Sequence, residues 1–522
     1  MLKNNQSNDE GTLNDVSGKL EQQSILSKTP LVPYSNPAGD EYPVIAYNNV
    51  QLVVEENGKS LKEATRREIY DFMTTVKDCG FNVNMWVSGN TLFENLIEEY
   101  LKVTKVIGIP SILNLSGWTP VKQDYDNEDK DKKNPIYKPT IQNLIDVLGS
   151  YWQHTNLWGY MLADEPFYNG WGLKNEIDIP EGTANFGMSY KAYETNHHDK
   201  HAFVVLPASL DTKYTTGKDP KDSEQTEDEE KDSVDKDYKS QYKDYLSNIC
   251  DGLSDNSRME MLAVDIYPII KEGGIDPATI KIEYFYSLEA IGEFSRENNI
   301  PFWLFLQSNY SVDYDANGNI EHTGVSPTVG TLRYQAMNAI AHGIQGLVFW
   351  TYGISFFNWH KKVVDPIEGT TEKTYVNEAC FNAPYVNYRK TKLWYNCQTV
   401  IPEIKKYGKI LLGAKFQAAR HVYGPSERDR YECTTELESS VPFGCISSAT
   451  ASGKGLVITL LKKDNTNYMA IVSHDWEKSQ SITINFLENS TPSFVNEKGS
   501  YGIIGKSINQ RIRPGDMILI KY

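Results

Sequence analysis

The sequence lacks the patterns that mark several common classes of protein. Its six cysteines are scattered over 522 residues without CxxC or metal-type spacing, which argues against a zinc site or a redox pair. Only Cys433 and Cys445 lie close enough in sequence to suggest a local disulfide. No run of about eighteen apolar residues is present, so no transmembrane helix is expected. The nine histidines include no HxH pair at a predicted strand end, so we expect no metal and no cofactor.

Basic residues are fewer than acidic ones. Asp and Glu number 69 against 52 for Lys and Arg, which gives a formal net charge of −17. A negative surface repels nucleic acid and anionic membranes, so a neutral ligand fits this chain better. Aromatic residues make up 12% of the chain and include 33 Tyr and 10 Trp. Such rings can stack on sugars, although many of them are expected simply to pack in a core.

The first thirty or so residues are polar and lack the apolar segment of a signal peptide. We expect residues 1–38 to form a disordered N-terminal tail. Such a leader resembles the tether that follows the lipidated cysteine of an envelope lipoprotein, and a disordered cytoplasmic tail would have the same composition. The working hypothesis is a secreted, periplasmic or outer-membrane-associated protein, with a lipid-anchored N-terminus as one option.

After the tail, short runs rich in Val, Ile, Phe and Trp alternate with longer segments of helical periodicity, which is typical of βα units around a parallel sheet. The runs predict eight strands, at 42–47, 81–88, 109–115, 158–163, 202–207, 259–267, 301–307 and 346–351. Helices are expected at 61–79, 90–106, 140–155, 238–253, 283–298 and 328–342, with a long final helix near 386–407. Eight strands fit a closed barrel better than an open sheet, and no glycine-rich phosphate loop of a doubly wound fold follows the first strand.

The predicted fold class is therefore α/β, with a (β/α)8 TIM barrel over residues 39–412. Residues 211–237 are dense in Asp, Glu and Lys, which predicts a mobile surface insertion within the barrel. Over residues 413–522, alternating runs of Thr, Ser, Val and Ile predict an antiparallel β-sandwich domain with strands at 456–461, 468–473, 481–486 and 517–521.

Acidic residues follow two of the predicted barrel strands, at the ends where TIM barrels carry their functional side chains. Asp164 and Glu165 follow the fourth strand, and Asp265 and Tyr267 end the sixth, on one side of it by strand alternation. A carboxylate beside a core is destabilised unless it is paired or lies in a cleft. A surface charge at Glu165 and a cap at Asp164 are the alternatives, and a cap is as good an interpretation of Asp164 as a functional role. The predicted catalytic residues are Glu165, Asp265 and Asp164.

Polar and aromatic residues at the strand ends and in the rim loops are candidates for binding a ligand. Gln307 and Asn309 follow the seventh strand and offer amide groups to hydroxyl-rich ligands. Aromatic rings at several strand ends make a stacking platform for a sugar expected, although a single Trp usually belongs to the core. The predicted substrate-binding residues are Tyr267, Gln307, Asn309, Trp350, Tyr352, Trp86 and Tyr168.

Four segments of the barrel resemble a known group of enzymes. GYMLADEP, AVDIYP, PFWLFLQS and RYQAMNAIAHGIQGLVFWTYG, in this order, are similar to β-galactosidase-like barrel glycoside hydrolases common in Bacteroidetes. By this resemblance Glu165 corresponds to the general acid/base after the fourth strand. The wider clan places a nucleophilic Glu at the end of the seventh strand, where this chain has Gln307.

Glycoside hydrolysis normally uses two carboxyl groups, about 5 Å apart for retention and roughly 6.5 to 9.5 Å apart for inversion. Since position 307 is not acidic, Asp265 is the best second carboxyl, as base or nucleophile. Asp164 could instead orient a substrate acetamide that acts as internal nucleophile. The expected function is hydrolysis of O-glycosidic bonds in an oligo- or polysaccharide. The alternatives are a non-catalytic glycan-binding protein on a degenerate barrel and a barrel enzyme of another class, such as a lyase.

Overall fold

The computed structural model describes most of the chain from residue 28 onward. The residues outside the description are 1–27, 50–52, 57–59, 64, 88–93, 117–140, 167–185, 197–198, 208–237, 253, 255–256, 271–278, 281–282, 312, 315–319, 322–326, 355–360, 365–373, 378–380, 387–388, 427–434, 439–440 and 497–498. The predicted insertion at 211–237 and the predicted binding residue Tyr168 lie in these stretches.

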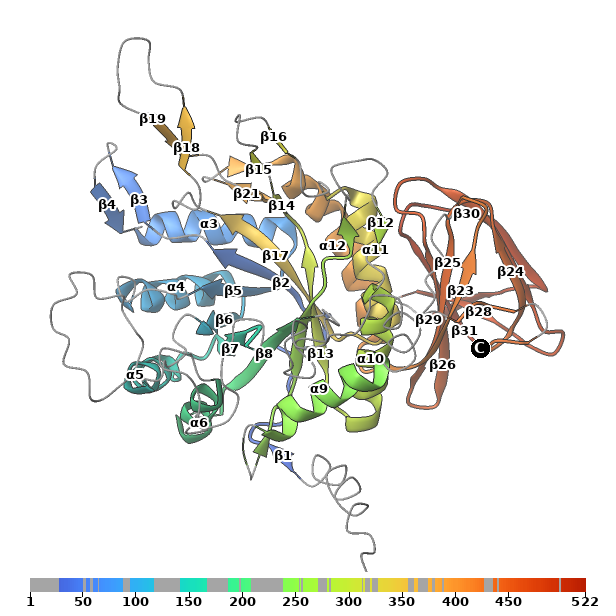
Figure 1. The fold of residues 1–522 in the computed structure, drawn as a ribbon, viewed down its shortest axis with the longest axis horizontal. Coiled ribbons are helices and arrows are strands. Elements are labelled where there is room, and N and C mark those ends of the chain that lie inside the picture. Colours follow the sequence, from blue (N-terminus) through green and yellow to red (C-terminus); the bar gives the residue numbers. More distant parts are fainter. Residues whose placement is uncertain are drawn as a thin grey trace, which may run out of the picture.

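Eight parallel strands form a closed barrel (Figure 1). They are β2 (Val44–Asn49), β5 (Val83–Val87), β6 (Ser111–Asn114), β7 (Leu157–Asp164), β8 (His201–Pro207), β10 (Leu262–Asp265), β13 (Phe302–Gln307) and β17 (Gly346–Ile354). Each strand pairs with the next one along the chain, and β17 pairs with β2 to close the circle. The predicted TIM barrel is therefore confirmed.

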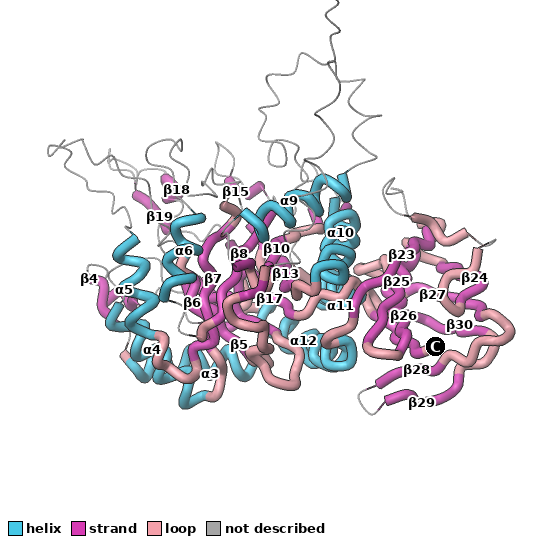
Figure 2. The backbone as a smooth tube through the Cα atoms, turned by 90° about the horizontal axis from the view of Figure 1, so that it is seen from below, coloured by secondary structure: helices cyan, strands magenta, loops and turns pink. Residues whose placement is uncertain are grey.

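One helix follows each barrel strand, and the helices surround the strands (Figure 2). They are α3 (Arg66–Cys79), α4 (Glu94–Ile107), α5 (Ile141–Tyr151), α6 (Phe186–Asn196), α9 (Tyr238–Gly252), α10 (Glu283–Asn298), α11 (Val329–Ala341) and α12 (Lys392–Leu411). Helix α6 was not predicted, because its apolar residues do not gather clearly on one face. Among the described residues, no helix combines the length and apolar character needed to cross a membrane.

Two helices start later than predicted. Residues 60–63 form strand β4 (Ser60–Glu63), paired with β3 (Val53–Glu56), and α3 begins only after Thr65. Thr65 and Glu68 form a capping box, in which the Thr65 side chain accepts from the Glu68 amide and the Glu68 side chain accepts from the Thr65 amide. The final helix starts at Lys392 rather than near 386, because β21 (Tyr385–Val386) and β22 (Arg389–Lys390) pair just before it.

Several short strand pairs lie outside the barrel sheet (Figure 1). They are β1 (Thr29–Pro30) with β9 (Ser257–Arg258), β11 (Ile269–Ile270) with β12 (Thr279–Ile280), β14 (Tyr310–Ser311) with β20 (Phe381–Asn382), β15 (Asp313–Tyr314) with β16 (Ile320–Glu321), and β18 (Lys361–Val364) with β19 (Thr374–Asn377).

The N-terminal segment from residue 28 to residue 41 packs under the amino end of the barrel, which corrects the prediction of disorder up to residue 38. Its strand β1 pairs with β9, and the Tyr34 hydroxyl accepts a hydrogen bond from the indole of Trp303 at 3.2 Å. Trp303 stacks on Trp158, with ring centroids 5.1 Å apart. The polar composition of the segment gave no sign of this contact, because one aromatic side chain and a short strand are enough to hold the segment in place.

The C-terminal domain consists of two antiparallel sheets that share one core. The larger sheet contains β23 (Lys415–Tyr423), β25 (Gly455–Lys463), β26 (Thr466–Ser473), β31 (Met517–Lys521), β28 (Ser493–Asn496) and β29 (Gly499–Ile503). The smaller contains β24 (Ile446–Ala451), β27 (Gln480–Phe486) and β30 (Ser507–Ile512). Buried isoleucines from both sheets meet between them, among them Ile458, Ile471, Ile484 and Ile508. The predicted antiparallel domain is confirmed. The Cys445 thiol in this domain is free, and Cys433, the partner suggested for it, lies outside the described residues.

This domain lies beside helices α10 and α11 of the barrel (Figure 1). The guanidinium of Arg296 donates to the carbonyl of Phe416 at 3.0 Å. Arg333 on α11 donates to the carbonyl of Pro514 at 2.9 Å and forms an ion pair with Glu403 at 2.6 Å. Two arginines on barrel helices thus bind main-chain carbonyls of the sandwich.

Gly159 in β7 offers a test of the close fit of the barrel strands. A Cβ atom at this position would lie 2.3 Å from the carbonyl oxygen of His201, and a paired strand cannot move away cheaply. We expect Gly159→Ala to lower the free energy of unfolding by roughly 1–3 kcal/mol in urea denaturation. Gly149→Ala on α5, where a Cβ would meet no heavy atom within 4 Å, should instead raise it by roughly 0.5–1 kcal/mol. Equal midpoints for the Gly159 variant and the unaltered chain would contradict this packing.

Candidate functional site

Three carboxyl groups gather at the carboxyl end of the barrel. Asp164 is the last residue of β7, Glu165 follows it, and Asp265 ends β10, with β8 between these two strands. The side chains of Glu165 and Asp265 are hydrogen-bonded to each other. The structure therefore brings together all three acids that the sequence predicts as catalytic.

The backbone holds Glu165 in an uncommon conformation. Its φ angle is 41°, in the left-handed region that residues other than glycine seldom adopt. Its amide donates to the carbonyl of Val205 on β8 at 2.9 Å, which ties the residue to the neighbouring strand. Such a conformation costs about 1–2 kcal/mol and persists where the surrounding structure fixes it. The strain therefore marks Glu165 as a residue that the barrel positions.

Asp265 holds its proton tightly. Burial raises the pKa of Asp265 well above its usual value, and the charge of Glu165 and the hydrogen bond to it raise this pKa further. The Oδ1 atom of Asp265 is buried and has no hydrogen-bond partner among the described residues. Because a buried carboxyl next to a second carboxyl is hard to ionise, Asp265 keeps its proton to a higher pH than an exposed aspartate does.

Asp164 lies beside the pair and also holds a proton more tightly than an exposed acid. Burial, followed by the charge of Glu165, raises the pKa of Asp164 from 3.8 to about 7. Burial, and then the charge of Asp164, raise the pKa of the Tyr47 phenol. Tyr47 on β2 therefore lies close to Asp164. The Tyr47 hydroxyl accepts a hydrogen bond from Asn114 at 3.0 Å. Tyr47 and Asn114 were not predicted, although both lie near the ends of barrel strands, which is the signal that could have identified them.

Two aromatic rings lie against the acids. Tyr267 and Trp350 pack with their centroids 5.3 Å apart and their planes inclined by 30°. Burial raises the pKa of the Tyr267 phenol, and the charges of Asp265, Asp164 and Glu165 raise it further, so the phenol is close to all three carboxyls. Trp350 is only partly buried and lies in the middle of β17, at the level where β13 ends with Gln307. The rings and the acids together form one surface, here called the carboxyl cluster: Asp164, Glu165, Asp265, Tyr267 and Trp350.

Gln307 and Asn309 lie at the same end of the barrel. Gln307 is opposite Trp350 in the pairing of β13 with β17. Its main chain is fixed by the side chain of Gln335, whose Oε1 accepts from the Gln307 amide at 2.9 Å and whose Nε2 donates to the Gln307 carbonyl at 3.3 Å. Asn309 is buried, and its Nδ2 has no hydrogen-bond partner among the described residues. A carboxamide at position 307 can donate and accept hydrogen bonds but cannot act as a nucleophile.

Two predicted binding residues face the helices instead. The Tyr352 hydroxyl is hydrogen-bonded to Thr75 of α3 at 2.9 Å and accepts from the Trp394 indole of α12 at 3.1 Å. Strand alternation predicts Trp350 and Tyr352 on one side, but the register of β17 against β2 shifts between Phe349 and Gly353. Trp86 is buried against Tyr100 of α4, with centroids 4.8 Å apart, because it occupies a helix-facing position of β5. Neither ring is part of the carboxyl cluster.

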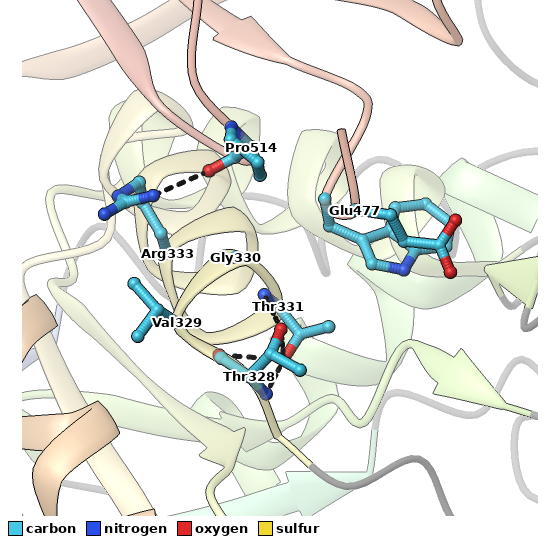
Figure 3. A pocket seen from close by; sticks show the side chains of 8 residues that line it. Thr328, Val329, Gly330, Thr331, Arg333, Glu477 and Pro514 are labelled. Atoms are coloured by element: carbon cyan, nitrogen blue, oxygen red, sulfur yellow. Dashed lines mark hydrogen bonds between the residues drawn. The ribbon is translucent and has the colours of Figure 1, made fainter. Parts of the chain in front are cut away.

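A separate pocket of about 430 Å³ lies at the junction of the two domains (Figure 3). Residues from the start of α11 line one side, and Trp476, Glu477 and Pro514 line the other. None of the five residues of the carboxyl cluster borders it. Within the described ranges, no group of three His, Cys, Asp or Glu side chains is arranged to hold a metal ion.

Comparison with known proteins gives similarity in fold alone. No protein-family model and no curated protein matches the sequence. Similar solved structures are glycoside hydrolases. They include Gas2 of Saccharomyces cerevisiae in complex with laminaritetraose and laminaripentaose (9% identity over 70% of this chain and 64% of that chain, TM-score 0.37). A GH5_18 protein from Streptomyces cattleya in complex with GlcNAc has 8% identity, coverage of 70% and 80%, and a TM-score of 0.37. A β-glucosidase from Thermotoga maritima has 9% identity, coverage of 72% and 99%, and a TM-score of 0.33.

The raised pKa of Asp164 predicts a pH dependence of stability. Between about pH 4 and about pH 7 the folded chain keeps a proton on Asp164 that the unfolded chain has lost, so the free energy of unfolding falls as the pH rises through this window. In Asp164→Asn this contribution is absent, so the free energy of unfolding should decrease by about 1–3 kcal/mol less across this pH window. Urea titrations at a series of pH values measure this difference. The same change at the exposed Asp146 on α5 should leave the pH dependence as it is. Identical slopes for Asp164→Asn and the unaltered chain would show that the carboxyl is not buried.

Proposed function

We propose that the chain is a glycoside hydrolase that cleaves O-glycosidic bonds of an oligo- or polysaccharide at the carboxyl cluster. The observation that carries this proposal is the contact between Glu165 and Asp265 beside the rings of Tyr267 and Trp350. Two carboxyl groups and an aromatic surface are the parts that this reaction requires. The resemblance to β-galactosidase-like hydrolases of Bacteroidetes supports the same class, and a secreted or envelope location would suit such an enzyme.

The spacing of the carboxyls supports a retaining reaction. Inversion needs room for a water between two carboxyl groups roughly 6.5 to 9.5 Å apart, whereas retention uses groups about 5 Å apart. Carboxyls in hydrogen-bond contact leave no such room. In the proposed first step Glu165 gives its proton to the leaving oxygen while a carboxylate oxygen of Asp265 bonds to the anomeric carbon. In the second step Glu165 takes a proton from water, and the water oxygen replaces Asp265.

In this mechanism a proton must be on Glu165 when the first step begins. Burial favours the proton on Asp265 in the free enzyme, and the existing hydrogen bond offers the path along which it moves. A sugar that enters between the two groups would separate them and leave the negative charge on Asp265, next to the anomeric carbon. Stacking on Trp350 and hydrogen bonds to Gln307 and Asn309 would hold the sugar there. Asp164, which lies near Tyr47, would polarise a ring substituent, for example an acetamide.

Removing the acid should abolish most turnover and leave binding intact. We expect Glu165→Gln to lower kcat by about 10²–10⁴-fold, because the leaving oxygen loses its proton donor, while the affinity for an oligosaccharide changes little. The measurements are release of new reducing ends from a panel of plant and host polysaccharides and isothermal titration with fragments of the polysaccharide that is cleaved. Asp265→Asn should give a similar loss. Glu98→Gln, the same change at an exposed position of α4, is the control. Undiminished turnover by the Glu165 variant would end this assignment.

A non-catalytic glycan-binding protein is the second candidate. The observation that favours it is Gln307, an amide at the end of the seventh strand. Titration with the same polysaccharide panel distinguishes the two functions. Binding without any released sugar, unchanged in Glu165→Gln, would support the binding protein and exclude the hydrolase.

A further inference from the structure

The amino end of the barrel carries a serine, a histidine and a glutamate in one hydrogen-bonded series. The Ser35 hydroxyl lies 2.7 Å from Nε2 of His201, and Nδ1 of His201 lies 3.0 Å from Oε1 of Glu260. These are the contacts between nucleophile, base and orienting acid that define a serine hydrolase triad. We propose that Ser35, His201 and Glu260 form a second reactive site, which attacks carboxylic esters.

Glu260 fixes the form of the histidine that a general base requires. It is 4% exposed, and its Oε1 also accepts from the amide of Ala202 at 2.6 Å, while its Oε2 accepts from the hydroxyl of Tyr193 at 3.4 Å. Burial raises the pKa of Glu260, and the bonds from His201 and Ala202 oppose this rise and so favour the carboxylate. An acceptor at Nδ1 keeps the ring proton there, so Nε2 presents its lone pair to Ser35.

A single tryptophan holds both the base and the nucleophile in place. The ring of Trp158 stacks on the ring of His201, with centroids 4.4 Å apart and planes inclined by 21°. Its indole nitrogen donates to the main-chain carbonyl of Ser35 at 2.9 Å. The imidazole therefore has little freedom to turn, and Ser35 is kept within reach of Nε2 although it lies in an irregular segment.

The nucleophile is accessible while its partners are not. Ser35 is exposed, whereas His201 and Glu260 are 5% and 4% exposed. The amides of Ser35 and Asn36 form no hydrogen bond to another described residue, so they are available to a developing oxyanion. The neighbouring rings of Tyr34 and Trp158 offer an apolar wall to a small acyl group.

The proposed reaction consumes only the ester and water. The Ser35 oxygen bonds to the ester carbonyl carbon, and its proton passes to Nε2 of His201. The bond from that carbon to the alkoxy oxygen then breaks, and His201 returns the proton to the leaving alcohol. Water, activated in the same way, splits the acyl-serine into a carboxylic acid and free Ser35.

This site is distinct from the carboxyl cluster. His201 begins β8 and Glu165 is bonded to the other half of the same strand, at Val205. His201 and Val205 are four residues apart along β8, about 13 Å at roughly 3.3 Å per residue, so the two sites lie toward opposite ends of the barrel. A bond that only anchors the N-terminal segment would give the same distances but no reactivity, so reactivity is the property to measure.

The test uses covalent labelling of the full chain. We expect diisopropyl fluorophosphate to add to Ser35, seen as one mass increment on the intact protein and mapped by peptide mass spectrometry. Release of p-nitrophenolate from p-nitrophenyl acetate should fall by at least about tenfold in Ser35→Ala, which changes an exposed side chain and should fold normally. Glu260→Gln should also slow the reaction, and thermal unfolding shows whether that variant is folded.

Controls separate this site from surface reactivity and from glycan cleavage. Ser150→Ala removes an exposed serine on α5 and should keep both the label and the ester hydrolysis. Cleavage of polysaccharide, if Glu165 carries it, should be the same in Ser35→Ala and in the unaltered chain. No adduct on Ser35, an equal adduct on Ser150, or equal ester hydrolysis by Ser35→Ala would overturn the proposal, whatever the outcome for Glu165.

Discussion

The contact between the carboxyls of Glu165 and Asp265 is the constraint on which the proposed chemistry of this barrel depends. Burial and the neighbouring Glu165 raise the pKa of Asp265, and this contact needs both backbones to be held in place. The closed sheet provides the support, since Asp265 is in register with Phe305 and the amide of Glu165 is bonded to Val205. Loss of register on either side would separate the pair and leave two unfavourable buried acids.

The two ends of the barrel differ in what fills them. The carboxyl end contains ionisable groups and a partly open aromatic surface, which a polar ligand could enter. At the amino end, Trp303 and Trp158 pack together with Tyr34, and the N-terminal segment covers them. The apolar contacts at the amino end stabilise the fold and offset the free-energy cost of half-buried acids at the carboxyl end. The same contacts also hold Ser35 against a buried histidine.

Strand periodicity was enough to predict the barrel and the position of its acids. The runs of buried residues in β7 and β10 lead directly to Glu165 and Asp265 at one end. The helix-facing position of Tyr352 could not be predicted, because it depends on a register shift between β17 and β2. No local sequence pattern indicates this shift. The role of Tyr34 depends on a contact with Trp303 that is 269 residues away in sequence. The later start of α3 was predictable in principle from the Thr65 and Glu68 capping box.

The position of β1 determines how the barrel would be presented when it is attached to a support. The pairing of Thr29 with Ser257 places the start of the described chain at the amino end, opposite to the acids. A bead, a surface or a fusion partner joined upstream of that strand would therefore face the closed side of the molecule. The mouth with the acids would point away from the support.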